Sequence, residues 1–93
     1  MKLIVCLECS SVFSLDFGVK ECTCGASKGV YDSEGITACY SGDNAIPLAI
    51  DNRSLALSIK EQPDEGLNEM MVNCFVVAKK DERFYKVNES ELE

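Results

Sequence analysis

The chain has 93 residues, of which 46% are hydrophobic, and its 16 acidic against 9 basic side chains give a net charge of −7. This length supports one domain with a modest core, because a chain of this size buries roughly 60–70% of its unfolded surface. The negative charge disfavours nucleic acid as a partner, since phosphate backbones are bound by clustered lysine and arginine. No histidine occurs, which removes the commonest general base and the usual ligand of catalytic zinc.

The segment from Met1 to Glu8 carries one positive charge, and its apolar run ends at Glu8. This run is too short for the apolar region of a secretory signal, and no stretch approaches the ~20 apolar residues of a membrane span. We therefore expect a cytoplasmic protein that does not enter a membrane. In that compartment thiols stay reduced, so paired cysteines bind a metal more often than they form disulfides.

Four cysteines form two close pairs near the start of the chain, Cys6-x2-Cys9 and Cys22-x-Cys24-Gly25. Two tight turns that each present two thiolates are typical of a zinc ribbon, although the second pair is one residue shorter than usual. Four protein ligands leave no coordination position for a substrate, so the pattern predicts structural Zn²⁺. Disulfides, a redox pair and a rubredoxin-like iron site are the alternatives.

Short strands are predicted on both sides of the cysteine pairs. These strands are Lys2 to Val5, Val12 to Leu15 and Val19 to Cys22. A β-hairpin is predicted over residues 29–40, because Asp and Gly within residues 32–35 supply its turn. Residues 45–50 read as a further strand, which Pro47 restricts to a sheet edge or a sheet end.

One helix is predicted over residues 53–62, where apolar side chains recur at helical spacing. Asp51 or Asn52 suits its N-cap, and Pro63 ends it.

Residues 71–78 are apolar on both faces apart from Asn73, as is typical of a central strand, and residues 84–87 read as an edge strand. The predicted fold class is α+β, with an N-terminal four-cysteine zinc ribbon that continues into an antiparallel sheet with one packed helix. We expect a single domain over residues 1–88 and a mobile acidic tail over residues 89–93.

Outside the cysteine pairs, one set of side chains suits an anionic ligand. A helix N-terminus offers free backbone N–H groups, an arginine adds charge, and tyrosines stack on a base. The candidate ligand-binding residues are Tyr31, Tyr40, Asn52, Arg53 and Ser54. The structural alternative makes Asn52 a plain cap, the tyrosines half-buried sheet residues and Arg53 the partner of a surface acid. Cys39 and Cys74 lie in apolar, strand-like settings and are predicted to be small buried hydrophobes.

Several motifs are distributed over residues 3–78. They are Cys6-Leu-Glu-Cys9-Ser-Ser-Val-Phe13-Ser-Leu15, Lys20-Glu-Cys22-Thr-Cys24-Gly25, Ala38-Cys-Tyr40-Ser-Gly42, Ile46-Pro-Leu48-Ala-Ile50-Asp-Asn52-Arg-Ser54 and Gln62-Pro63-Asp-Glu65-Gly66. Together they resemble a set of small, uncharacterised zinc-ribbon proteins of bacteria and their phages. The resemblance implies a zinc ribbon joined to a sheet-and-helix body, and it brings no catalytic residues. A phage context implies a small protein that binds and neutralises a host component.

The chain contains no phosphate-binding loop, nucleophile elbow or acidic metal loop, so we expect a binding module and not an enzyme. The first hypothesis is a protein-binding or inhibitory module directed at a host factor. The alternative is a small-ligand binder that sequesters a nucleotide or another anionic signal, and a nucleic-acid-associated ribbon is third. An exposed sheet edge on so small a domain also predicts a homodimer, with Arg53 and Tyr40 lining a pocket at its interface.

Overall fold

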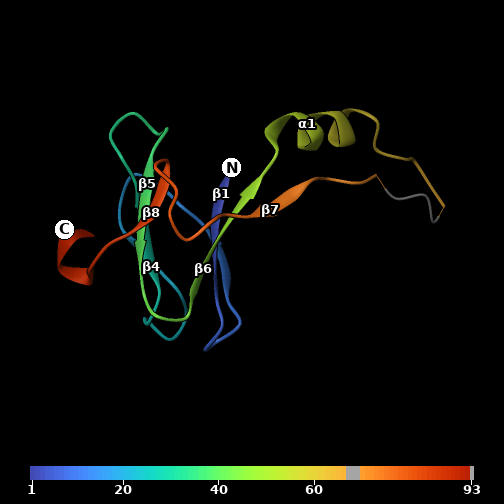
Figure 1. Cartoon of the computed structure of the whole chain (residues 1–93). Helices are drawn as coiled ribbons and strands as arrows, with labels where there is room; N and C mark the ends of the chain where they lie inside the picture. The colour runs from blue at the N-terminus through green and yellow to red at the C-terminus, as the bar shows by residue number, and fades with distance from the viewer. Residues whose placement is uncertain (67–69, 93) are drawn as a thin grey trace.

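The computed structural model, which describes residues 1–66 and 70–92, contains two four-stranded sheets, one α-helix and a short 3-10 helix (Figure 1). The first sheet has the order β2-β1-β6-β7 and the second has the order β3-β4-β5-β8. The strands of the first sheet are β1 (Lys2–Cys6), β2 (Val12–Ser14), β6 (Ala45–Ile50) and β7 (Cys74–Val76). Those of the second are β3 (Lys20–Glu21), β4 (Lys28–Tyr31), β5 (Ala38–Ser41) and β8 (Phe84–Lys86).

Neighbouring strands pair antiparallel except for β5 and β8, which are parallel. The predicted hairpin is confirmed, with Val30 opposite Cys39. Its turn is held by the Asp32 carboxylate, which accepts hydrogen bonds from the backbone N–H groups of Glu34 (3.1 Å) and Ile36 (3.2 Å). The turn chemistry therefore fixes the register of β4 and β5 locally.

The core lies between the two sheets. Its buried members are Ile4, Leu15, Ala38, Tyr40, Ala45 and Phe84. Tyr40 and Phe84 meet edge to face, with ring centroids 5.4 Å apart. Gly29 allows the sheets to approach, because a Cβ there would stand 2.5 Å from Ile4 Cδ1 and 2.7 Å from Leu15 Cδ2.

Strand β6 lies inside the first sheet, between β1 and β7, so of the two predicted places, a sheet edge or a sheet end, the edge is wrong. Pro47 is accommodated because the pairing with β7 covers only Leu48 to Ile50. One residue beyond that ladder, Pro47 contributes only its carbonyl, which accepts from the N–H of Val77 at 2.9 Å. Proline has no N–H to donate in return, and the ladder with β7 begins at the next residue, Leu48.

Helix α1 (Asn52–Lys60) begins after Asp51, whose carboxylate accepts from the N–H of Arg53 at 3.2 Å, so the predicted N-cap is confirmed. The predicted packing of the helix on the sheet is wrong, because α1 has no buried residue. Ser58 Oγ donates instead to the carbonyl of Met71 at 2.8 Å. Helix α1 with residues 61–66 and 70–73, here called the arm, extends away from the sheets (Figure 1) and gives the molecule dimensions of 47 × 29 × 23 Å.

Residues 71–78 do not form the predicted central strand. Only Cys74–Val76 are strand residues; they form β7 at the edge of the first sheet, and all three are exposed. Phe75 is 56% and Val76 72% exposed. The apolar side chains of β7 therefore lie on the surface of the single chain, whereas Val77, just beyond the strand, packs against the core.

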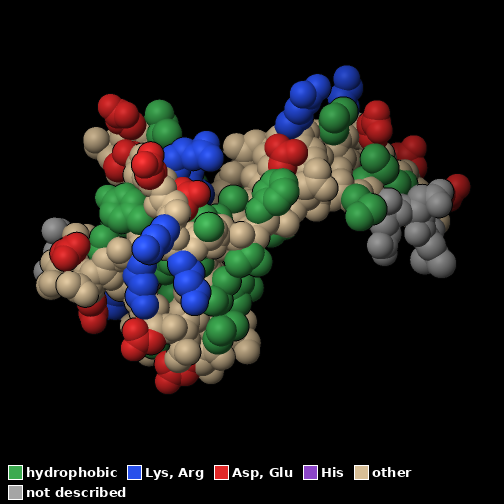
Figure 2. Space-filling view, viewed as in Figure 1, with side chains coloured by type: hydrophobic (Ala, Val, Ile, Leu, Met, Phe, Trp, Pro, Cys, Tyr) green, Lys and Arg blue, Asp and Glu red, His purple; other side chains and the backbone are tan. Residues whose placement is uncertain are grey.

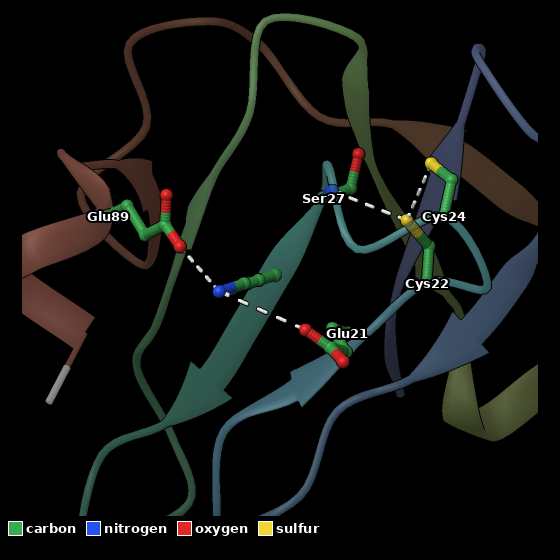
Figure 3. A network of polar contacts seen from close by, with 6 residues as sticks. Glu21, Cys22, Cys24, Ser27 and Glu89 are labelled. Carbon is green, nitrogen blue, oxygen red and sulfur yellow. Dashed lines mark hydrogen bonds and ion pairs between the residues drawn. The ribbon is translucent and has the colours of Figure 1, made fainter.

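Residues Glu89–Leu92, predicted to lie in a mobile tail, form the 3-10 helix and bury the side chain of Leu92. The ammonium group of Lys28 makes ion pairs with Glu89 and, at 3.8 Å, with Glu21 (Figure 3). The described part of the tail is thus attached to the second sheet.

Candidate metal centre

Two hairpin loops, one from each sheet, bring four cysteines together. Cys6 ends β1 and Cys9 lies in the loop from β1 to β2, while Cys22 and Cys24 lie in the loop from β3 to β4. Their four sulfur atoms lie within 4.8 Å of one another. An ion bound by these sulfurs would link the first sheet to the second.

Each loop is closed by a backbone hydrogen bond to its first cysteine. The N–H of Ser10 donates to the carbonyl of Cys6 (2.8 Å), and the N–H of Gly25 donates to the carbonyl of Cys22 (3.0 Å). In each loop the residue after the second cysteine has a left-handed backbone, with φ 61° at Ser10 and 76° at Gly25. This geometry turns both thiols of a pair towards the same point.

Two of the distances between sulfur atoms are close to those of a tetrahedral metal site. A Zn–S bond of ~2.3 Å implies sulfurs about 3.8 Å apart in a tetrahedron. Cys6 and Cys24 are 3.8 Å apart, and Cys22 and Cys24 are 3.4 Å apart (Figure 3). The N–H of Ser27 points at Cys22 Sγ from 3.3 Å, as expected where a backbone dipole supports thiolate charge. These four cysteines can therefore hold a metal ion.

The surroundings of the thiols separate their pKa values. The Ser11 hydroxyl, 3.0 Å from Cys9 Sγ, and the backbone N–H groups of Cys24 and Ser11 lower the pKa of Cys9 to about 5. Burial acts to raise the pKa of Cys22, but the Ser27 N–H and the thiols of Cys24 and Cys6 outweigh it and lower that pKa.

At Cys24 the N–H of Ala26 favours the thiolate. The neighbouring Cys22, burial and the other cysteines outweigh this effect and raise the pKa of Cys24 to about 12. Without a cation the cluster thus holds both thiolates and thiols. A divalent ion removes this conflict, because it stabilises all four sulfurs in the thiolate form.

Two of the remaining predicted site residues, Asn52 and Ser54, have hydrogen-bond partners within the protein. Asn52 Oδ1 accepts from the Met1 ammonium at 2.5 Å, and Ser54 Oγ donates to the Asp51 carbonyl at 3.0 Å and accepts from the Asn73 N–H at 2.9 Å. The side chain of Arg53 is exposed. The side chain of Asn52 therefore contacts the N-terminus and is not the helix cap of the structural alternative, because Asp51 takes that place.

The tyrosines lie apart from this helix start, in the body of the protein. Tyr31 is half-buried and its hydroxyl accepts from the Lys2 N–H at 3.0 Å, whereas Tyr40 is buried against Phe84. Of the two remaining cysteines, Cys39 is half-buried and Cys74 is exposed, so the prediction of a buried thiol is wrong for Cys74.

A cleft of about 340 Å³ was not predicted from the sequence. Tyr40, Pro47 and Val77 form part of its wall, and Lys79 and Lys86 lie at its rim. The Lys86 ammonium is 3.5 Å from the Asp43 carboxylate, which balances part of its charge. Three segments far apart in the chain build this cleft, so no local motif signals it.

The chain matches no protein-family model, no curated protein and no solved structure. The resemblance to small zinc-ribbon proteins of bacteria and phages therefore stays a prediction. Within residues 1–66 and 70–92, none of the helices has both the length and the apolar character needed to cross a membrane.

Proposed function

We propose that this protein is a zinc-ribbon binding module, in which one Zn²⁺ on Cys6, Cys9, Cys22 and Cys24 has a structural role. The observation that supports it most is the convergence of four sulfurs within 4.8 Å from loops of two different sheets. Four thiolates favour zinc, and they leave no position for a substrate. The metal holds the sheets together, and binding takes place elsewhere on the surface.

Metal analysis of protein purified without chelator tests the first part of the proposal. We expect about one Zn per chain, and native mass spectrometry should show the same stoichiometry. One iron per chain, with the absorption bands of an iron tetrathiolate, would replace zinc by a rubredoxin-like site. A folded protein with four reduced thiols and no metal would refute the site.

The arm supports a protein as the binding partner. Leu57, Ile59 and Met71 are exposed there, and hydrophobic side chains are visible on both the body and the arm (Figure 2). A helix of nine residues with no buried side chain has little stability of its own, because most helix stability comes from packing of an apolar face. Contact with a partner protein would supply that packing. The resemblance to phage proteins favours a host factor as the target and inhibition as the outcome.

Pull-down with the zinc-loaded protein tests the second part. A specific partner should be captured by the unmodified chain and lost with Leu57→Lys, which places a charge on the exposed face of α1. Val12→Lys is the matched control, because Val12 is also exposed but lies on β2, away from the arm. Equal capture by both variants would exclude the arm, and turnover of a small molecule abolished by one side-chain change would exclude a non-catalytic role.

The small-ligand alternative has less support. The polar groups of Asn52 and Ser54 are already hydrogen-bonded within the protein, and Tyr40 is buried in the core. We therefore keep protein binding as the proposed function.

A further inference from the structure

Strand β7 leaves one of its backbone edges unpaired. The Asn73 carbonyl accepts from the Asp51 N–H and the Val77 N–H donates to the Pro47 carbonyl, each at 2.9 Å. Backbone groups alternate in direction along an antiparallel strand, so those of Cys74 and Val76 point away from β6. In the described part of the chain, no strand lies beyond β7 in this sheet.

This edge lacks the features that usually prevent edge pairing. Sheet edges are commonly protected by lysine, proline or a bulge. Residues 70–78 carry no charge and no proline, in a chain where 27% of the residues are charged. Phe75 and Val76 stand exposed at the centre of this stretch. The edge is thus open to another strand of low charge.

We propose that β7 pairs with β7 of a second copy of this chain, antiparallel and centred on Phe75, so that two first sheets join into one. This register places Cys74 opposite Val76 of the second copy and overlaps all three strand residues. The four outward backbone groups of Cys74 and Val76 would then be paired. The two Phe75 side chains meet at the two-fold axis in a pair without hydrogen bonds, where side chains approach most closely.

Charge complementarity favours a second copy as the occupant. If the pairing continues along the chain, Lys80 of one copy comes beside Met70 of the other. Met70 lines a groove of about 560 Å³ whose wall also contains Asp64 and Glu65. Acidic side chains gather towards this far end of the arm (Figure 2). Antiparallel pairing thus brings Lys80 of each copy towards the acidic groove of the other, despite the net charge of −7.

The metal site does not require self-pairing, so the pairing can fail while the proposed function holds. Sedimentation velocity on the zinc-loaded full chain should give a mass of twice 10.2 kDa at micromolar concentration. Val76→Pro removes an outward N–H that β6 does not use, and it should reduce the mass to 10.2 kDa with zinc content unchanged. Val76→Thr is the matched control, keeps the N–H and should stay dimeric.

A cross-link tests the register without relying on proline. With Cys74→Ser in place, Phe75→Cys should form an interchain disulfide under mild oxidation, because facing residues of such a pair have suitable Cα spacing. In the same background Val76→Cys should not, because its thiol faces position 74 of the second copy, which lacks one. Lys80→Glu should weaken the dimer more than Lys20→Glu, although both change the net charge equally.

Three results would overturn the proposal. They are a monomer at every concentration, a dimer that persists with Val76→Pro, and a monomer whose β7 edge takes up an extended peptide of another protein. Retained zinc in these cases would leave the metal site of the proposed function intact.

Discussion

Replacement of Cys22 by serine tests whether the metal holds the two sheets together. Cys22 is 5% exposed, and its sulfur lies 3.4 Å from Cys24 Sγ and 3.3 Å from the Ser27 nitrogen. A structural zinc site contributes roughly 10–16 kcal/mol of binding free energy, whereas a chain of this length has a net stability of roughly 5–14 kcal/mol. Loss of one of the four ligands is therefore expected to remove several kcal/mol, which is on the order of half the free energy of unfolding or more.

Urea unfolding followed by circular dichroism, with zinc measured on the same samples, checks this expectation. Cys74→Ser is the matched control, because it removes an exposed thiol outside the cluster, and the free energy of unfolding should change by no more than about 0.5 kcal/mol. Both variants should be compared at one protein concentration. Equal urea midpoints together with one zinc per chain in both variants would refute the assignment of Cys22 as a ligand.

Three further substitutions or conditions test the geometry around the cluster and between the sheets. Gly29→Ala places a methyl group 2.5 Å from a side-chain atom of the facing sheet and should lower the unfolding free energy by about 1–3 kcal/mol, whereas Gly18→Ala, with nothing within 4 Å, should leave it almost unchanged. Ser10→Gly relieves a left-handed backbone at φ 61° and should raise the unfolding free energy by up to about 1 kcal/mol, which a higher thermal midpoint would show. A lower thermal midpoint would show that the Ser10 side chain contributes more stability than its backbone conformation costs. The pKa of Cys9 in the fold, about 5, lies below its unfolded value of ~8.5, so the stability from its thiolate is present above pH ~8.5 and is lost as the pH falls through 5. Because protons compete with zinc for the four thiolates, zinc measured after gel filtration should be released on acidification, and full retention in strong acid would contradict thiolate ligands.

The parts of the structure that could be predicted from the sequence are those fixed over a few residues. Each cysteine pair sits on one tight turn, so its spacing predicts that both thiols converge. The hairpin turn at residues 32–35 and the Asp51 cap are also local, and the structure has them as predicted. The packing of the two sheets determines how the two cysteine pairs come together. That they share one site could nevertheless be predicted, because both pairs offer ligands for the same metal ion.

The errors concern contacts between distant segments. Residues 71–78 are as apolar as a central strand, but a central strand needs a neighbour on each side. Composition does not say whether the same chain supplies the second neighbour. Likewise, the spacing of apolar residues in α1 predicts that the helix packs on one face, but it does not show which segment that face contacts. No local pattern predicts the parallel pairing of β5 with β8, because the paired residues Ala38 and Phe84 are far apart in the sequence. Strands β6 and β7 of the first sheet and the whole arm lie between them along the chain. Tyr40 and Arg53 were grouped because both suit an anion, yet one lies in the core and the other at the start of α1.

The metal centre and the β7 edge are connected through β6. This strand pairs on one side with β1, where Ala45 lies opposite Cys6, and on the other side with β7, where Ala49 lies opposite Phe75. Loss of the metal should disorder the end of β1 and weaken the platform on which β7 lies, so chelation should also dissociate the dimer. Dissociation by Val76→Pro breaks only contacts beyond β7 and should leave the cysteine cluster loaded. Measurement of mass and zinc content on the same samples separates the two effects, and a dimer that persists after complete removal of zinc would show that the edge is held independently of the cluster.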